Sequence, residues 1–369
     1  MRIALVHDWL TGMRGGERAL EVLCELYPSA DLFTLVHVPG SVSAAIEQRS
    51  PKTSFIQHLP RAGRLYRTYL PLFPAAIERF DFTGYDLVIS TSHCVAKSAL
   101  TRPPTRHLCY CFTPMRYAWD QFDQYFGPAR VGRLPSAAAR VVLRRLARWD
   151  ARTAGRANRY VAISHYVASR IRRYYNRQAV VVYPPVDTAF FHPDGRPPGR
   201  HFLVVSALVP YKRIDVAIEA ARLAGVGLTI VGDGPERRRL QGTAGPHVTF
   251  LGRRPDTEVR ELYRSALAVV LPGEEDFGIA PLEAQACGRP VLALARGGAL
   301  ETVLADRTGV LVEDDSPEAL AEGMGRVAAS RFDPAVIRSH AERFGRDRYR
   351  QEMRMLVEET MAAAGDARW

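Results

Sequence analysis

Short runs of consecutive apolar, mostly β-branched residues recur along the chain, and segments with helical spacing separate most of them. The runs are continuous rather than alternating, a pattern that is typical of strands buried on both faces of a sheet. Alternation of such strands with helices predicts an α/β fold built on parallel sheets. The predicted strands are residues 3–7, 32–37, 86–90, 107–111, 159–163, 179–183, 202–207, 227–232, 248–252, 267–271, 290–294 and 309–313.

The series of strands is interrupted at residues 183–201, where five of 19 residues are proline and two are glycine. Proline removes a backbone donor and blocks helix, so this composition predicts a linker. We expect two Rossmann-like, doubly wound domains, 1–185 and 186–345, that face each other across a cleft, because such sheets bind ligands at the carboxyl ends of their strands. A last helical pattern bends near Gly345, and its part from about 346 to 369 could pack back on the first domain.

Composition narrows the class of protein. The 50 basic and 39 acidic residues give a net charge of +11, which favours anionic partners such as nucleic acid, an anionic membrane or phosphorylated small molecules. The five cysteines form no CxxC pair of the kind found in metal sites, and their odd number indicates a reducing compartment. No apolar run is long enough to span a bilayer, and the first residues predict a strand rather than a signal peptide. We therefore expect a cytoplasmic protein, which could lie on the cytoplasmic face of the membrane.

The segment LPGEEDFGIAPLEAQACGRPVLAL, residues 271–294, places acids where a predicted strand meets a helix. The helix should begin near Ile279–Pro281, where proline suits the first turn, and end near Cys287–Gly288. Glu275 then lies in the loop and Glu283 in the first turns. A carboxylate can accept from two neighbouring sugar hydroxyls, and a helix start attracts phosphate. Alternatively, Glu283 only complements the helix dipole and the loop acids are solvated.

Loops after other predicted strands carry cations or glycines. In SALVPYKRIDVAIEA, Lys212 and Arg213 precede an amphipathic helix, and paired cations there suit a diphosphate leaving group; a solvated basic pair is the alternative. The turn at 232–235 and the glycines at 15–16, before a helix from about Glu17, let backbone approach a ligand or simply turn the chain. None of these loops is a GxGxxG motif or a P-loop.

In this order, the motifs resemble those of the retaining GT-B glycosyltransferases of the large family 4, the mannosyltransferase-like group that uses nucleotide-diphosphate sugars. The resemblance covers nearly the whole chain. Its most specific part is the E-x7-E motif formed by Glu275 and Glu283, for which Glu274 and Asp276 are out of register. The segment TPMRYAWD, 113–120, looks like one found in a subgroup that acts on bacterial surface polysaccharides.

The resemblance implies a role for each matching residue. Glu283 would hold the ribose hydroxyls of the nucleotide, Glu275 would touch the donor sugar, and Lys212 would neutralise the departing diphosphate, so that Glu275 and Lys212 are the catalytic candidates. The further donor-binding candidates are Gly16, Arg213 and the N–H groups near Phe277, Gly278 and Ile279. The acceptor- or sugar-side candidates are Asp8, His93 and Arg116. No metal and no cofactor is implied, and the sequence contains no DxD triplet to hold a metal.

Two positions depart from the pattern of the family. Ala207 stands where many relatives have arginine, which leaves one cation fewer; Arg213 could compensate or point away. Phe112 stands where many relatives have a histidine near the sugar, and a phenylalanine can neither transfer a proton nor accept a hydrogen bond. His93 or Asp8 could take over, although His93 could equally have a core or capping role. If no base is required, the leaving phosphate oxygen itself takes the acceptor proton.

A basic stripe covers residues 129–178, which hold thirteen arginines and a single acid, Asp150. Four of the arginines recur every fourth residue, at 140, 144, 148 and 152, on one face of a predicted helix. Residues 59–80 mix arginines with tyrosine, leucine and phenylalanine. Such surfaces can rest on anionic lipid, which would suit a lipid-linked acceptor; a solvated helix face is the alternative.

The resemblance therefore implies a metal-independent hexosyltransferase. It would move mannose from GDP-mannose, with retained configuration, to a glycan or a polyprenyl-diphosphate-linked acceptor in surface polysaccharide synthesis. A UDP- or dTDP-sugar donor stays open, because only subgroup resemblance favours GDP-mannose. A sugar-nucleotide epimerase has a similar architecture but lacks the E-x7-E motif. The net charge suggests a nucleic-acid-binding protein, but the arginines lack interleaved aromatics on a strand platform, so no nucleic-acid partner is expected.

Overall fold

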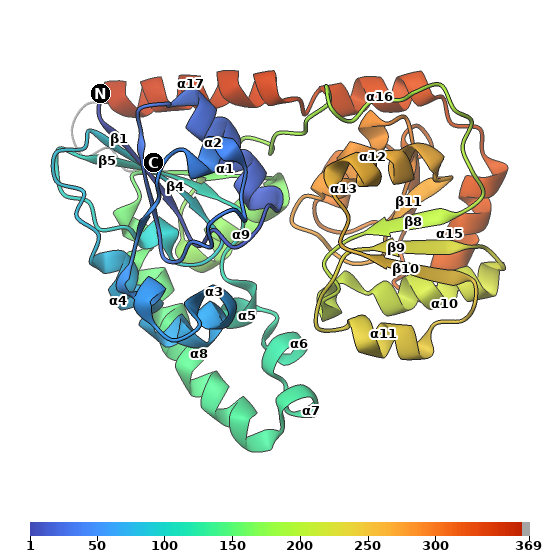
Figure 1. The fold of residues 1–369 in the computed structure, drawn as a ribbon, viewed down its shortest axis with the longest axis horizontal. Helices are drawn as coiled ribbons and strands as arrows, with labels where there is room; N and C mark the ends of the chain where they lie inside the picture. The colour runs from blue at the N-terminus through green and yellow to red at the C-terminus, as the bar shows by residue number, and fades with distance from the viewer. Residues whose placement is uncertain (364–369) are drawn as a thin grey trace. The chain divides into compact units, whose positions relative to one another are not determined.

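The computed structural model describes residues 1–363, which form two compact units, each built on its own sheet (Figure 1). The first unit contains Met1–Pro185 and the described chain from Tyr349 on, and the second contains Val186–Arg348. Both sheets are parallel and covered by helices, as the continuous apolar runs predict. Residues 364–369, the end of the predicted terminal helix, lie outside the described residues.

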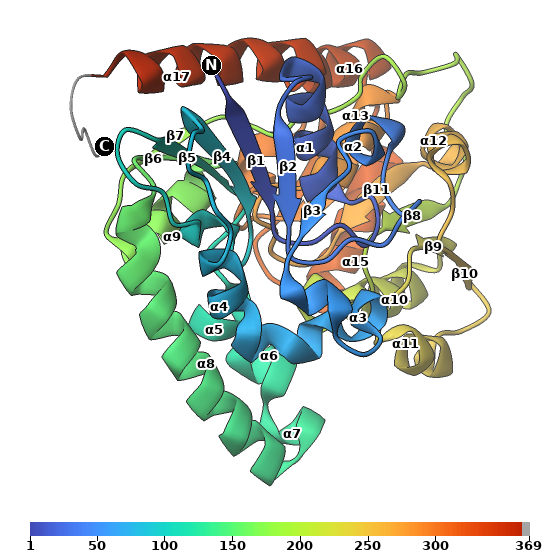
Figure 2. The same ribbon diagram turned by 60° about the vertical axis from the view of Figure 1, so that its left-hand side comes forward.

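The sheet of the first unit has seven strands in the order β3-β2-β1-β4-β5-β6-β7 (Figure 2). All five residues of β1 and all six of β4 are buried, because helices cover both faces of the sheet. Six of these strands overlap predicted runs; the two-residue edge strand β3 was not predicted. The strands are β1 (Ile3–His7), β2 (Asp31–Thr34), β3 (Lys52–Thr53), β4 (Leu87–Ser92), β5 (Arg106–Cys111), β6 (Arg159–Ala162) and β7 (Ala179–Val181).

Many short helices and one long one surround this sheet. The α-helices are α1 (Gly15–Leu26), α2 (Ala44–Glu47), α3 (Ala62–Leu65), α4 (Phe73–Glu78), α5 (Arg116–Trp119), α6 (Phe122–Phe126), α7 (Pro128–Val131), α8 (Arg133–Thr153), α9 (His165–Tyr175) and, from Tyr349 on, α17 (Arg346–Ala362). The 3-10 helices are η1 (Phe55–His58), η2 (Tyr66–Leu72), η3 (Ala96–Ser98) and η4 (Ala154–Arg156). Helix α1 begins two residues earlier than predicted, and the carboxylate of Glu17 accepts a hydrogen bond of 3.1 Å from the N–H of Arg14.

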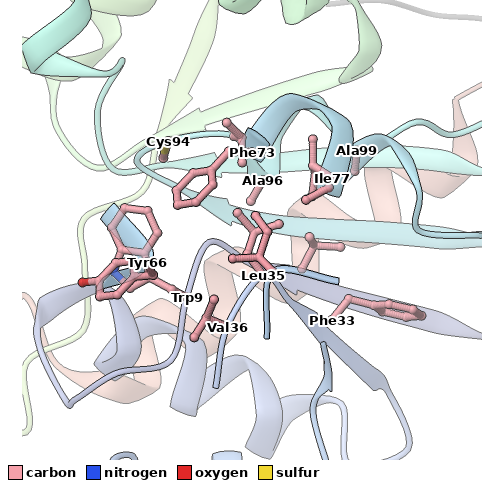
Figure 3. Packing of buried hydrophobic residues seen from close by; sticks show 14 of the residues in the cluster. Trp9, Phe33, Leu35, Val36, Tyr66, Phe73, Ile77, Cys94, Ala96 and Ala99 are labelled. Carbon is pink, nitrogen blue, oxygen red and sulfur yellow. The ribbon is translucent and has the colours of Figure 1, made fainter. Parts of the chain in front are cut away.

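Aromatic side chains from the loops pack on the core of the first unit (Figure 3). The ring of Trp9 lies 5.1 Å from that of Tyr66 and 6.0 Å from that of Phe73, measured between centroids. Tyr66 and Phe73 are buried, and burial of each such side chain contributes roughly 1.5–3 kcal/mol. Tyr66 and Phe73 of segment 59–80 thus pack inward, whereas Arg64, Arg67, Leu65 and Leu72 of the same segment are exposed.

The sheet of the second unit has six strands in the order β10-β9-β8-β11-β12-β13. Each strand lies within a predicted run. They are β8 (Phe202–Val205), β9 (Leu228–Val231), β10 (Val248–Gly252), β11 (Ala268–Leu271), β12 (Val291–Leu294) and β13 (Gly309–Val312). The helices are η5 (Pro210–Lys212), α10 (Ile214–Ala224), α11 (Arg237–Thr243), α12 (Asp256–Ser265), α13 (Ile279–Ala286), α14 (Ala299–Thr302), α15 (Pro317–Ala329) and α16 (Pro334–Glu342).

Two details of the sequence pattern can be compared directly with these helices. Helix α13 has the predicted bounds to within a residue. The terminal helical pattern is interrupted at residues 343–345, between α16 and α17, where Gly345 predicts a bend.

All five cysteines are buried and free. Among the helices of residues 1–363, none is both long and apolar enough to cross a bilayer.

Candidate active site

The order of strands in the second sheet reverses between β8 and β11. These two strands are neighbours, and β9 and β12 lie on their outer sides. Loops that leave the carboxyl ends of strands at such a switch point diverge, and ligands bind there. Lys212 follows β8 and Glu275 follows β11, so the topology brings the two predicted catalytic candidates to one edge of the sheet.

The side chains of Lys212 and Glu275 are in contact. The ammonium Nζ of Lys212 donates to Oε1 of Glu275, and only 15% and 12% of the two side chains is exposed. Each charge is therefore balanced by the other in a site that water reaches poorly. A ligand that carries both negative phosphate and hydroxyl groups could engage the same two groups, because an ammonium binds phosphate and a carboxylate accepts from hydroxyls.

Arg213 has a different partner from its sequence neighbour Lys212. Its backbone adopts the left-handed conformation, with φ of 50°. Its guanidinium donates to Asp315 Oδ2, in the loop after β13, at 2.6 Å. The adjacent positions of Lys212 and Arg213 in the sequence predict a pair of cations; in the structure each one pairs with a separate acid.

Glu283 lies in α13 and is 7% exposed. Tyr263, which is fully buried in α12, donates from its hydroxyl to Oε2 of Glu283 at 3.0 Å. This hydrogen bond fixes the orientation of the carboxylate. The helical spacing of α12 gives Tyr263 a buried position, but nothing in the sequence pairs it with an acid twenty residues later, so its role was missed.

Close backbone contacts hold the loops at this edge together. The N–H of Gly298 donates to the carbonyl of Glu275 at 2.8 Å. A Cβ atom at Gly298 would lie 2.3 Å from Cα of Phe277, so only glycine allows this approach. Phe277 is itself buried, and Gly278, with φ of 95°, and Ile279 lead into α13. The Phe277 ring is therefore packed inside the second unit and is not exposed to solvent.

The first sheet has its own switch point, between β1 and β4. Asp8 follows β1, and its carboxylate is completely buried. It accepts four backbone hydrogen bonds from the turn after β4: Oδ2 from the N–H groups of His93 (2.7 Å) and Cys94 (2.9 Å), and Oδ1 from those of Val95 (2.7 Å) and Ala96 (2.8 Å). Both oxygens of Asp8 are thus occupied in holding this turn.

His93 lies beside Asp8 and is partly open to solvent. Its Nδ1 is 3.3 Å from Asp8 Oδ2, its side chain is 30% exposed, and its ring packs edge-on against Trp9 with 4.4 Å between centroids. Desolvation lowers the pKa of His93; the charge of Asp8 opposes this shift and that of His7 reinforces it. The imidazole is therefore neutral at pH 7 and able to accept a hydrogen bond.

Phe112, His7 and Gly16 lie next to one another at this edge. The rings of Phe112 and His93 are 6.3 Å apart, and a Cβ atom at Gly16 would lie 3.1 Å from the ring of Phe112. His7 bonds Thr91 through Nδ1 at 2.7 Å, and its Nε2 lies 3.8 Å from Glu17. Burial raises the pKa of Glu17, but the hydrogen bond and charge of His7 outweigh this and lower it. The sequence analysis did not identify this buried pair.

Arg116, the remaining acceptor-side candidate, begins α5 and is 8% exposed. Two contacts hold the end of segment 113–120. Trp119 Nε1 donates to Asp150 Oδ2 at 2.8 Å, and Arg170 forms an ion pair with Asp120. The segment 113–120, which follows β5, is thus held firmly at the same edge as His93 and Phe112.

Comparisons with known proteins agree with this architecture. The family model for Glycosyltransferase Family 4 matches residues 13–190, and that for Glycosyl transferases group 1 matches residues 189–348. The crystal structure of the Anabaena protein HepE in complex with UDP and glucose has a TM-score of 0.70 at 19% identity and covers 96% of this chain and 99% of that chain. At this identity the likeness shows the fold alone.

Two relatives are similar in sequence over part of their length. A D-inositol 3-phosphate glycosyltransferase of Streptomyces bingchenggensis is 31% identical over 258 residues, which are 59% of this chain and 55% of that protein. A GDP-mannose-dependent alpha-(1-6)-phosphatidylinositol monomannoside mannosyltransferase of Mycolicibacterium smegmatis is 33% identical over 198 residues, 45% of this chain and 52% of that protein. The chain spans about half the length of the curated relatives it matches. The two family models together match residues 13–348, and the two parallel sheets have the fold of the GT-B glycosyltransferase structures.

Proposed function

We propose that the chain is a retaining glycosyltransferase that transfers a hexose, mannose from GDP-mannose, to a glycan or lipid-linked acceptor without a metal ion. The contact of Lys212 with Glu275 at the switch point of the second sheet carries the proposal. It supplies a cation for the diphosphate and a carboxylate for the sugar from adjacent loops. The choice of donor is supported by the printed name of the Mycolicibacterium relative, which is GDP-mannose-dependent.

In this proposal the bond between the anomeric carbon and the β-phosphate oxygen breaks while the acceptor oxygen bonds to the same face of that carbon. The proton of the acceptor hydroxyl passes to the departing phosphate oxygen, and the products are the glycoside and the nucleoside diphosphate. Negative charge grows on the diphosphate during this step. The Lys212 ammonium stabilises that charge more in the transition state than in the ground state, which is what accelerates a reaction.

Glu283 is proposed to bind the ribose of the nucleotide. Its carboxylate is mostly buried and one oxygen is held by Tyr263, so it meets a diol in a fixed orientation. Charge-assisted hydrogen bonds of this kind are about twice as strong as neutral ones. Among the acceptor-side candidates, His93 suits a sugar hydroxyl better than Asp8, because both oxygens of Asp8 already accept backbone hydrogen bonds.

The donor is tested by thermal unfolding with a panel of GDP-mannose, UDP-glucose, dTDP-glucose and the free diphosphates. A ligand at 100 times its Kd stabilises by about 2.7 kcal/mol, which corresponds to several degrees in Tm for a unit of this size. GDP-mannose should give the largest shift. A larger shift with a uridine or thymidine sugar corrects the donor but keeps the enzyme class, whereas no shift with any nucleotide contradicts the proposal.

A lipid-linked acceptor is supported by the exposed face of α8. Leu134 and Val141 are 85% and 52% exposed, and they share a seven-residue spacing with the exposed Arg148. Apolar and basic side chains on one face favour binding to anionic lipid. The chain should float with vesicles containing phosphatidylglycerol at low salt, and Leu134→Glu should reduce the floated fraction. Absence of flotation with the unchanged chain would remove the membrane from the proposal.

A further inference from the structure

A cavity of about 290 Å³ opens in the first unit away from the candidate active site. Its walls come from residues 101–105, just before β5, and from residues 152–158, at the end of α8 and before β6. The strands of this sheet are parallel, so the cavity lies at the amino-terminal edge. Asp8, His93 and Phe112 follow the carboxyl ends of β1, β4 and β5, at the opposite edge.

Three arginines line the cavity, and no carboxylate does. Arg102 and Arg152 are exposed, and within residues 1–363 neither guanidinium group makes a hydrogen bond or an ion pair. Arg102 interacts with Asp81 only through charge, at longer range. Arg156 is held in place: one N–H group donates to the carbonyl of Ser98 at 2.8 Å and another to Glu78 at 2.7 Å. Two guanidinium groups are thus left uncompensated beside one cavity.

Neutral hydrogen-bonding groups complete the walls. The amide oxygen of Asn158 accepts from the N–H of His107 at 2.8 Å, which leaves the NH₂ group of Asn158 as a donor. Thr101 adds a hydroxyl, and the hydroxyl of Thr105 donates to the carbonyl of Tyr85 at 2.7 Å. The cavity therefore combines fixed polar groups with two cations free to move toward a ligand.

This combination selects an anion with several acceptor oxygens. Like-charged guanidinium groups repel each other, and an anion between them removes that repulsion. The planar fork of arginine matches phosphate oxygens in a bidentate manner. The volume is close to the lower limit of about 300 Å³ for ligand pockets, so it fits a phosphate group with a small substituent. We propose that this cavity binds the phosphate group of a ligand other than the sugar donor.

The proposal goes beyond the proposed function, because Lys212, Glu275 and Glu283 do not line the cavity. It holds whichever sugar donor the chain uses. The shared chemistry is a phosphate group, which could belong to a small metabolite or to a lipid headgroup. Free phosphate and phosphate-bearing vesicles separate these two sources.

Binding of a free ligand is measured with the full chain by line broadening in ³¹P NMR, during titration of inorganic phosphate and pyrophosphate at low salt. The double variant Arg102→Gln/Arg152→Gln should bind at least about tenfold more weakly. The matched control Arg64→Gln/Arg172→Gln removes the same charge from exposed positions of the same unit outside the cavity. It should bind as the unchanged chain does. Both variants should keep the original melting temperature, since all four side chains are exposed.

The variant Lys212→Gln separates this cavity from the donor site, since the part of the broadening that Arg102→Gln/Arg152→Gln removes should persist in it. Loss of broadening in Lys212→Gln together with normal binding by Arg102→Gln/Arg152→Gln would place the phosphate in the donor site and overturn the inference. Flotation with vesicles of phosphatidic acid in phosphatidylcholine tests whether the phosphate group belongs to a lipid headgroup. Flotation that is reduced only in the Arg102/Arg152 double variant, without free phosphate binding, identifies a headgroup. Absence of both kinds of binding overturns the proposal.

Discussion

Asp8 and Glu275 each follow a strand at the switch point of their own sheet, yet their carboxylates have different partners. Asp8 accepts four backbone N–H groups of one turn, whereas Glu275 contacts the flexible side chain of Lys212. Backbone amides are fixed by the chain, but a lysine side chain can turn toward a phosphate. The same topological position therefore holds a turn together in the first unit and carries a side-chain ion pair in the second.

Gly16 in the first unit and Gly298 in the second also differ in what they contact. Gly16 leaves room for the ring of Phe112, an apolar contact within the protein, whereas Gly298 lets two loops of the second unit approach through their backbones. Gly16 thus allows side-chain packing, and Gly298 allows the close approach of two backbone segments.

The largest effect expected from this comparison is on stability. Asp8→Ala would leave four N–H groups without partners, three of them buried, and we expect the free energy of unfolding to fall by at least about 3 kcal/mol. Urea unfolding followed by tryptophan fluorescence measures this, because Trp9, Trp119 and Trp149 all lie in the first unit. Asp8→Asn keeps one acceptor oxygen and should cost less. A loss below about 1 kcal/mol in Asp8→Ala would show that the turn does not depend on this carboxylate.

The next effect concerns catalysis at the second edge. Lys212→Ala should lower kcat by roughly 10²–10³, the size seen when a group that stabilises transition-state charge is removed. The neighbouring Arg213→Ala should lower kcat less than about tenfold, because the Arg213 guanidinium pairs with Asp315. Steady-state rates with saturating donor decide between them, and equal losses in the two variants would contradict the separate roles of the two cations.

The third effect is a pH dependence of the first unit. Burial, together with the charge of Lys97, lowers the pKa of His107, in β5, to about 3. The unfolded chain binds this proton near pH 6.5, so stability present above that pH is lost as pH falls toward 3, by at most about 1.4 kcal/mol per pH unit. His107→Gln should flatten the pH profile of urea unfolding below pH 6.5, and the exposed His58→Gln should not. An unchanged slope in His107→Gln would contradict this origin.

The smallest effect should come from Tyr263, which acts only through Glu283. Tyr263→Phe removes one hydrogen bond, worth about 0.5–1.5 kcal/mol, so KM for the donor should rise a few-fold while kcat stays nearly constant. A structural role alone would lower stability without this split. Donor titrations at saturating acceptor give both constants; a fall in kcat at constant KM would be inconsistent with a positioning role.

The sequence predicted the strands well because a buried parallel strand needs a continuous apolar run, and each of the twelve runs overlaps one strand. It missed β3, since Lys52–Thr53 is too short to carry a pattern. It placed Lys212, Glu275 and Glu283 after the correct strands, because glycine, proline and charge mark the loops. It could not show that Lys212 contacts Glu275 or that Tyr263 holds Glu283, because such contacts depend on strand order and helix packing. The four bonds to Asp8 come from residues 85 to 88 positions away, a distance over which local patterns carry no information.

The central claim is that the second edge binds a nucleotide sugar through Glu283, and calorimetric titration of GDP into two variants tests it most directly. Glu283→Gln should weaken binding by roughly 10- to 100-fold, since hydrogen bonds to a charged group contribute about 1.5–3 kcal/mol. Glu274→Gln, which makes the same change outside the E-x7-E register, should bind GDP as the unchanged chain does. Equal affinities of the unchanged chain and Glu283→Gln would contradict the account.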